Sequence, residues 1–124
     1  MNTAFIILAM IFMHIVDDYY LQGWLASAKQ KSWWKENAPD PLYKYDYIWA
    51  LIMHSFSWSF MIMLPLAYVN EFTVDQLFVS MFITNLVFHA VTDTLKANVK
   101  AINLWMDQII HMAQIFGTAY VFLS

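Results

Sequence analysis

The sequence predicts an all-α integral membrane protein, a four-helix transmembrane bundle that forms a single domain over residues 1–124. Two observations lead to this fold class. The chain is 61% hydrophobic and only 12% charged, whereas soluble domains are about half apolar and about a quarter charged. Four stretches also reach the roughly 20 mostly apolar residues that a helix needs to cross the hydrocarbon core of a bilayer.

The four expected spans cover roughly residues 3–28, 46–69, 73–95 and 101–123. Continuous helices are favoured in them because lipid offers backbone N–H and C=O groups no hydrogen-bond partner. The first apolar run is not preceded by the basic residues of a signal peptide, so we expect it to be retained as a helix.

The connection at residues 29–45 is the longest, and we expect it to lie on the cytoplasmic membrane surface. Trp33, Trp34, Tyr43 and Tyr45 suit the headgroup layer, because their rings have one apolar and one polar side. All six lysines lie in this connection and in the link after the third span. The positive-inside rule therefore places both links in the cytoplasm and both termini in the periplasm, across an inner or plasma membrane.

Polar residues inside the expected spans recur at steps of three and four, which places them on one face of each helix. An aspartate at mid-helix costs about 2.5–3.5 kcal/mol on insertion scales, so these groups need protons, opposite charges or a metal to neutralise them. Helices rise about 1.5 Å per residue, and on that scale the groups form one layer in the cytoplasmic half. The titratable members are His14, Asp18, His54, His89, Asp93, Asp107 and His111.

This layer predicts a divalent metal site with one or two ions. Imidazole and carboxylate bind zinc, which we expect first, and also manganese or iron. Bundle-core metal sites are built in this way from side chains that several helices project inward. The expected ligands are all seven residues of the layer. They outnumber the four of a tetrahedral zinc site, so either two metals share them or some only orient others.

Spacing alone does not assign a role to each residue of the layer. Asp17 can also reach His14 at a three-residue step, and periodicity scarcely separates it from Asp18. We expect Asp18 and His54 to be catalytic, with an interhelical hydrogen bond as the alternative for His54. The expected substrate-binding residues, with surface or packing roles as alternatives, are Gln22, Lys29, Lys96 and Gln108.

The ordered motifs resemble a family of small polytopic membrane proteins from bacteria and phages. The family is called domain of unknown function 3307 and is related to predicted membrane-bound metal-dependent hydrolases. The resemblance covers nearly the whole chain, implies a metal site and favours Asp18 over Asp17. Tyr19 stands where phenylalanine is usual. The matching positions are His14, Asp18, Tyr19 and Gln22 in HIVDDYYLQ, then Lys29 and His54, then His89, Asp93 and Lys96 in HAVTDTLK, and Asp107, Gln108 and His111 in DQIIH.

The expected function is metal-dependent hydrolysis of a lipid-like or phosphoester substrate from the cytoplasmic side. One alternative is a transporter or relay for protons or divalent metal, because intramembrane carboxylates and histidines mark such pathways. Another is a non-catalytic membrane interaction protein with a structural metal. The expected partners are the lipid bilayer, a lipid-like substrate, and a second copy or another membrane protein. The net charge of −3 gives no indication of nucleic-acid binding.

Overall fold

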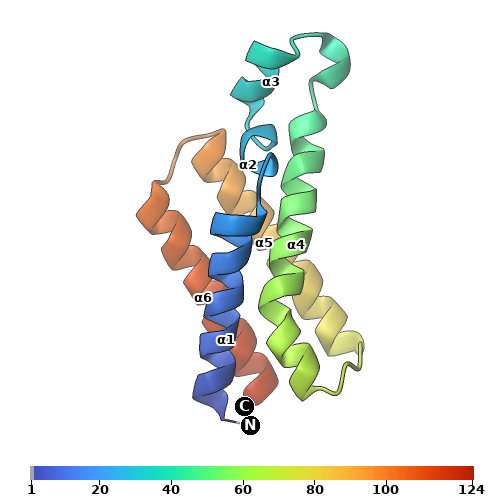
Figure 1. Ribbon diagram of the computed structural model, residues 1–124, viewed down its shortest axis with the longest axis vertical. Coiled ribbons are helices and arrows are strands. Elements are labelled where there is room, and N and C mark those ends of the chain that lie inside the picture. The colour runs from blue at the N-terminus through green and yellow to red at the C-terminus, as the bar shows by residue number, and fades with distance from the viewer. Residues whose placement is uncertain (1) are drawn as a thin grey trace.

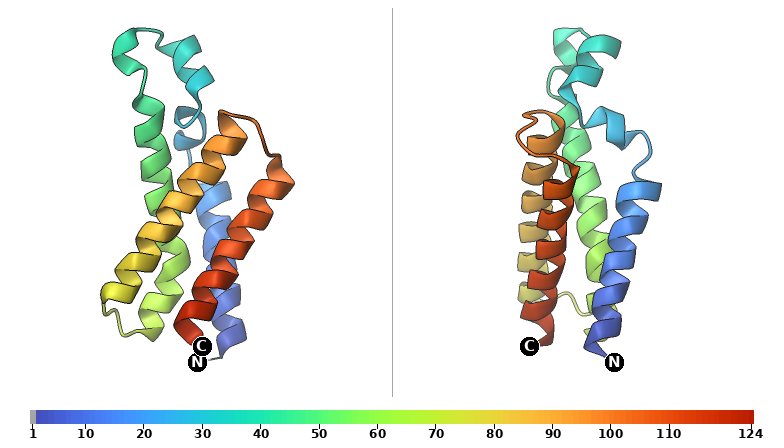
Figure 2. Two further views of the ribbon diagram at one scale, coloured as in Figure 1. Left: turned by 180° about the vertical axis from the view of Figure 1, so that it is seen from behind. Right: turned by 90° about the vertical axis from the view of Figure 1, so that its left-hand side faces the viewer.

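The computed structural model describes residues 2–124, in which all regular secondary structure is helical and no strand occurs. The prediction of an all-α chain is therefore confirmed. Four long helical segments run side by side, as Figures 1 and 2 show from three directions: α1 (Thr3–Ile15) continued by η1 (Val16–Leu21), α4 (Asp46–Val69), α5 (Gln76–Ala97) and α6 (Leu104–Leu123). The start of α1 and the end of α6 lie at the same end of the bundle as the α4–α5 turn (Figure 1).

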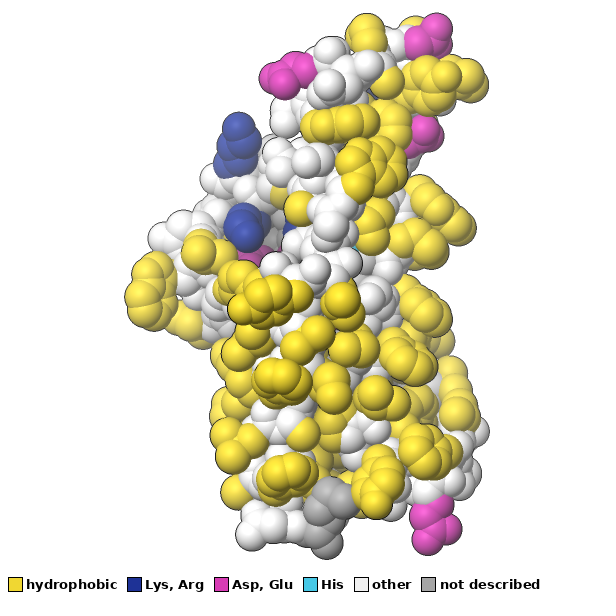
Figure 3. Space-filling view, in the orientation of Figure 1, with side chains coloured by type: hydrophobic (Ala, Val, Ile, Leu, Met, Phe, Trp, Pro, Cys, Tyr) yellow, Lys and Arg dark blue, Asp and Glu magenta, His cyan; other side chains and the backbone are white. Residues whose placement is uncertain are grey.

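Three helical segments are long and apolar enough to cross a membrane: Thr3–Leu21, Pro41–Val69 and Gln76–Ala97. α6 is not among them, because its polar side chains lower its mean hydropathy; these are Asp107, Gln108, His111 and Gln114. The fourth span thus stays a prediction. Large hydrophobic side chains are exposed on every long helix, and Figure 3 shows them covering the middle and lower part of one face. This surface suits contact with lipid.

The first expected span differs from the structure. A continuous helix over 3–28 was predicted, but the helix ends at Leu21 and a short helix, α2 (Leu25–Ala28), follows. Between them Gly23 adopts a φ of +55°, a left-handed conformation that glycine takes without steric cost. The two parts can therefore point in different directions (Figure 2). α3 (Lys31–Asn37) and η2 (Pro41–Tyr43) then occupy the expected interfacial connection.

The segment Val16–Leu21 is a π-helix. A π-turn closes between residues i and i+5 and is wider than an α-turn, and such turns are frequent at functional sites. In a regular α-helix, neighbouring residues point about 100° apart. Here Asp17 is buried and the side chain of Asp18 is only 10% exposed. The wide turn therefore directs both aspartates into the bundle.

The last two long helices begin later than predicted, because a side-chain cap defines each start. Asp75 accepts a hydrogen bond from the backbone N–H of Phe78 at 2.8 Å, and Asn103 accepts one from Met106 at 3.0 Å. Aspartate and asparagine satisfy free N–H groups in this way at helix starts. Residues 73–75 and 101–103 thus lie outside the helices that were predicted to include them.

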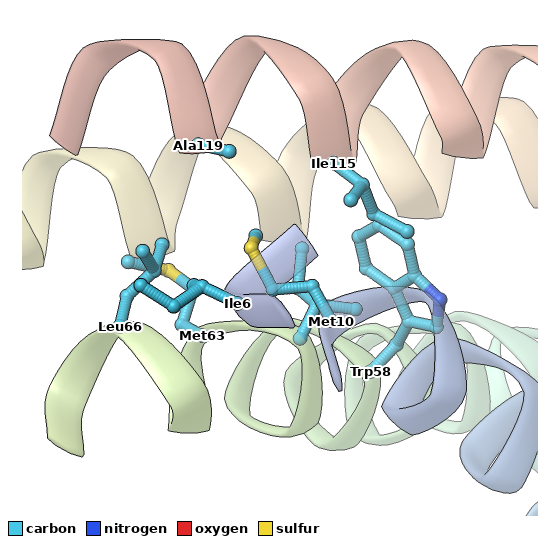
Figure 4. Close-up of a cluster of buried hydrophobic side chains, with 8 residues drawn as sticks. Ile6, Met10, Trp58, Met63, Leu66, Ile115 and Ala119 are labelled. Atoms are coloured by element: carbon cyan, nitrogen blue, oxygen red, sulfur yellow. The ribbon is translucent and has the colours of Figure 1, made fainter. Parts of the chain in front are cut away.

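An apolar core fills the half of the bundle nearest the termini (Figure 4). α4 supplies half of it, which makes this helix the centre of the packing. The eight members are Ile6, Met10, Trp58, Ile62, Met63, Leu66, Ile115 and Ala119. Trp58 ends this core, since its ring also stacks on His89 with 4.3 Å between the ring centroids. Beyond Trp58 the buried residues are mainly polar.

Candidate metal site

The buried polar residues of the other half form one cluster to which all four long segments contribute. His54, His89 and His111 come from α4, α5 and α6, and each is 0% or 1% exposed. η1 contributes the two aspartates. The layer predicted from helical periodicity is thus assembled in space, because the repeated steps of four place each helix's polar face toward the bundle axis.

Asp93 of α5 lies at the centre of the cluster. Its Oδ2 atom is 3.3 Å from Nε2 of His54 and 3.4 Å from Nε2 of His89. Its Oδ1 atom is 3.3 Å from Nε2 of His111. One carboxylate therefore faces imidazoles from three helices, with one oxygen turned toward each side.

Two groups of side chains have the spacing of metal ligands. The first is Asp18, His54 and His89, and the second is His89, Asp93 and His111. Within each group the ligand atoms lie within 4.8 Å of one another. Asp107 extends the second group, since its Oδ1 atom is 3.3 Å from Nε2 of His111. Because the two groups share His89, they could hold one ion or form two adjacent positions.

Several atoms at the centre of the cluster have no hydrogen-bond partner among residues 2–124. They are the Nε2 atoms of His54, His89 and His111, and Oδ1 of Asp107. Carboxylate oxygens lie nearby, but their alignment satisfies none of these atoms. Buried polar atoms are nearly always paired, and leaving one unpaired costs about 1–3 kcal/mol. Imidazole nitrogens and carboxylate oxygens that converge in this way fit a divalent cation such as zinc, manganese or iron.

Gln114 determines which nitrogen of His111 faces the centre. Its Nε2 donates to the backbone oxygen of Asn85 at 3.1 Å, so its Oε1 must be the atom that lies 3.1 Å from Nδ1 of His111. An amide oxygen only accepts, so Nδ1 of His111 carries the proton. The lone pair of a neutral His111 is then on Nε2, which faces Asp93 and Asp107.

His14 is engaged by hydrogen bonds on both sides of its ring. Nε1 of Trp58 donates to Nδ1 at 2.7 Å, and an indole N–H can only donate. The opposite nitrogen, Nε2, then donates to Oε1 of Gln108 at 2.8 Å, and Gln108 donates to Oδ2 of Asp107 at 3.0 Å. The structure thus places His14 outside the two ligand groups, in a chain that positions Asp107.

Asp17 lies behind His54, on the side of the ring away from Asp18. Its Oδ2 atom is 3.7 Å from Nδ1 of His54, while Oδ1 of Asp18 is 3.1 Å from Nε2. Ser57 donates a hydrogen bond to Asp17 and holds the carboxylate in place. A carboxylate behind a metal-binding histidine commonly orients the ring. The two adjacent aspartates therefore occupy different places around one imidazole.

Two lysines reach the cluster from the end covered by α2. Nζ of Lys29 lies 2.9 Å from Oδ2 of Asp93, and its side chain is only 11% exposed. Nζ of Lys96 lies 3.8 Å from Oδ2 of Asp107. Gln22 instead donates to the backbone oxygen of Asp18 at 3.0 Å, so its amide group caps the wide turn.

The net formal charge of the cluster is negative and matches the charge of one divalent cation. Its members are four carboxylates and two ammonium groups, a formal charge of −2 if the histidines are neutral: Asp17, Asp18, Asp93, Asp107, Lys29 and Lys96. Buried charges must be balanced to be tolerated. One divalent ion would bring the formal charge to zero.

Sequence reasoning missed the contributions of Trp58 and Ser57. Neither residue stood out, because tryptophan and serine are common in membrane helices and a hydrogen bond between two helices depends on the relative register of those helices.

The chain matches no protein-family model, no curated protein and no solved structure. The function must therefore be argued from this site.

Proposed function

We propose that the protein binds a divalent metal ion within a membrane-embedded bundle and hydrolyses a lipid-like or phosphoester substrate from the cytoplasmic side. One observation carries the proposal: three imidazole nitrogens and a carboxylate oxygen converge, buried and without hydrogen-bond partners among the described residues. The residues that would hold the ion are Asp18, His54, His89, Asp93, Asp107 and His111. A bound divalent ion would supply Lewis acidity toward water and toward the scissile ester or phosphoester.

The neighbouring side chains hold these residues in place. Gln114 keeps His111 in the tautomer with its lone pair on Nε2. The charge of Asp17, 3.7 Å from Nδ1 of His54 and so beyond hydrogen-bond distance, favours a proton on that nitrogen. The chain from Trp58 through His14 and Gln108 orients Asp107. Orientation by such supporting contacts is commonly worth tenfold to a hundredfold in metal affinity.

Asp18 is the best placed group to accept a proton. Its side chain is 10% exposed, whereas those of Asp93 and Asp107 are 4% and 2% exposed. A general base must lie within hydrogen-bond reach of the proton that it removes, and Asp18 is the carboxylate of this cluster closest to the outside. His54 would act here as a ligand rather than as a base, because its Nε2 atom, 3.1 Å from Oδ1 of Asp18, is the nitrogen that would face the ion.

In this function α6 would be a fourth membrane helix. Its polar face is directed at the cluster, while Ile109, Phe116 and Tyr120 are exposed on the outside. The lysine-bearing end would face the cytoplasm and the termini the periplasm. The apolar core between Trp58 and the termini would then separate the site from the periplasmic side, which favours one-sided access over transport.

Metal content is the test of this function. We would measure it by mass spectrometry on detergent-purified protein, on a His89→Ala/Asp93→Ala double variant, and on an Asp40→Ala control in the exposed connection. We expect near-stoichiometric zinc, manganese or iron in the wild type and the control, and its loss in the double variant. A folded wild type without metal would overturn the proposal.

The hydrolase activity has its own test. Metal-loaded wild type would be offered phospholipids, an isoprenoid phosphate and a peptide. We expect cleavage of an ester or phosphoester that stops in an Asp18→Asn variant. If no substrate is cleaved by protein that carries its metal, the hydrolase proposal fails while the metal site stands.

A further inference from the structure

A lysine-lined pocket opens next to the metal cluster. Its volume is about 390 Å³, and its lining consists of Ala26, Lys29, Gln30, Lys96, Ala97 and Lys100. Half of the six lysines of the chain line it, and no carboxylate does. All the charged residues of this lining are lysines, so its charge favours an anionic ligand.

The walls of this lysine pocket are held in place by Asn98. Its Nδ2 donates to the backbone oxygen of Lys29 at 3.0 Å, and its Oδ1 accepts from the backbone N–H of Lys31 at 2.7 Å. These bonds join the end of α2 to the end of α5. Lys100 follows with a φ of +60°, and the next residue, Ala101, bonds back to the oxygen of Leu95 at 2.8 Å. The three lysines are therefore brought together by a defined backbone arrangement.

The lysine pocket and the metal cluster share two side chains. Lys29 contacts Asp93 at 2.9 Å, and Lys96 contacts Asp107 at 3.8 Å. Lys100, in contrast, forms no salt bridge within residues 2–124. An anion bound between these ammonium groups would therefore lie next to the carboxylates and imidazoles that would hold the metal.

We propose that the lysine pocket binds a phosphate group, so that the substrate of this protein is a phosphate-bearing molecule. The inference rests on the proposed function and narrows its substrate class. A phosphate oxygen accepts strong charge-assisted hydrogen bonds from lysine. The phosphate belongs either to a lipid headgroup or to a soluble ester. Trp24 and Trp33, which precede and follow α2 in the chain, pack edge to face with 5.6 Å between ring centroids. Trp24 is exposed, and an exposed tryptophan suits the membrane surface.

The test measures binding rather than activity. Detergent-purified protein would be titrated with inorganic phosphate and with phenyl phosphate, and isothermal titration calorimetry would measure the binding. Nanodiscs of phosphatidylcholine with and without phosphatidic acid would form the second arm. The variants are Lys100→Gln and, as a matched control, Lys35→Gln on α3 outside the pocket. We expect Lys100→Gln to bind phosphate about tenfold more weakly than wild type, because it loses one charge-assisted hydrogen bond. The Lys35→Gln control should bind phosphate as tightly as wild type.

Saturation by the soluble phosphates alone would indicate a soluble ester, and saturation only with phosphatidic acid would indicate a lipid headgroup. Both results support the phosphate site. Equal binding by wild type and Lys100→Gln, or no binding of any probe, would overturn it. Because metal content is measured separately, protein that carries metal but binds no phosphate refutes only this inference. Protein that binds phosphate but carries no metal refutes only the metal-dependent function.

Discussion

The indole of Trp58 on α4 donates a hydrogen bond to Nδ1 of His14 on α1, with 2.7 Å between the two nitrogens. This contact joins the apolar core to the polar cluster, because the same indole ring stacks on His89. It also determines the tautomer of a neutral His14 and so the direction of every later hydrogen bond toward Asp107. A residue of the apolar core therefore controls the orientation of a carboxylate in the candidate metal site.

Trp58→Phe removes this donor and keeps an aromatic ring against His89. We expect the free energy of unfolding to fall by about 1–3 kcal/mol, because Nδ1 of His14 is left buried without a partner. Thermal unfolding in detergent would show the loss. The matched control is Trp105→Phe, since Trp105 is 78% exposed. An equal loss in both variants would contradict the role of the Trp58 hydrogen bond.

His89→Ala and His14→Ala separate a ligand from a positioning residue. His89 belongs to both ligand groups, so its removal should abolish stoichiometric metal binding. His14→Ala leaves every atom of those groups and should weaken metal affinity by about tenfold to a hundredfold. Competition with a fluorescent zinc chelator would measure both affinities. If His14→Ala abolished binding as completely as His89→Ala, His14 would itself be a ligand.

Asp17→Asn and Asp18→Asn should differ in kind, although the residues are adjacent. An asparagine at position 17 can still accept the hydrogen bond from Ser57, so we expect metal to remain with about tenfold lower affinity. Asp18→Asn removes a ligand and the proposed base, so activity should be lost even at saturating metal. Metal titration together with a hydrolysis assay distinguishes these outcomes. If Asp17→Asn lost activity at saturating metal and Asp18→Asn only bound metal more weakly, Asp17 would be the ligand.

Lys29→Met tests the charge balance of the cluster. Removal of one member of a buried ion pair leaves an uncompensated charge, which costs about 3–5 kcal/mol. We expect the metal-free variant to unfold at a clearly lower temperature and the loss to shrink when zinc is added. Lys31→Met on α3 is the control, because Lys31 forms no salt bridge within the described residues. A variant as stable as wild type without metal would show that Lys29 does not balance Asp93.

Cysteine accessibility tests the membrane orientation. With no cysteine in the native chain, single cysteines can be placed at Glu71 and at Lys35 without background. An impermeant thiol reagent added outside intact cells should label Glu71→Cys and leave Lys35→Cys unlabelled. The opposite labelling pattern would reverse the proposed topology.

Hydropathy and helical periodicity predicted much of this fold. The second helix, Asp46–Val69, has the bounds expected for it, and the histidines and aspartates of four segments meet as their spacing indicated. The family resemblance is a separate matter, since no comparison supports it and it stays a prediction.

The parts that could not be predicted depend on departures from regular helices. The spacing argument assumes about 100° per residue, so it could not foresee the wide turn that buries both Asp17 and Asp18. Hydropathy does not reveal the break at Gly23, which lies between η1 and the α2 segment that carries Lys29 toward Asp93. The bond between Trp58 and His14 depends on the relative rotation of two helices, which no single segment encodes.

The π-helix at Val16–Leu21 makes the first segment a helix with a shift in phase. Residues before the wide turn and residues after it follow two different helical wheels, offset by one position. A chain shortened by one residue here could close an ordinary α-turn, and only one of the two aspartates would then point inward. The number of carboxylates in the site therefore depends on the length of this segment as well as on its composition.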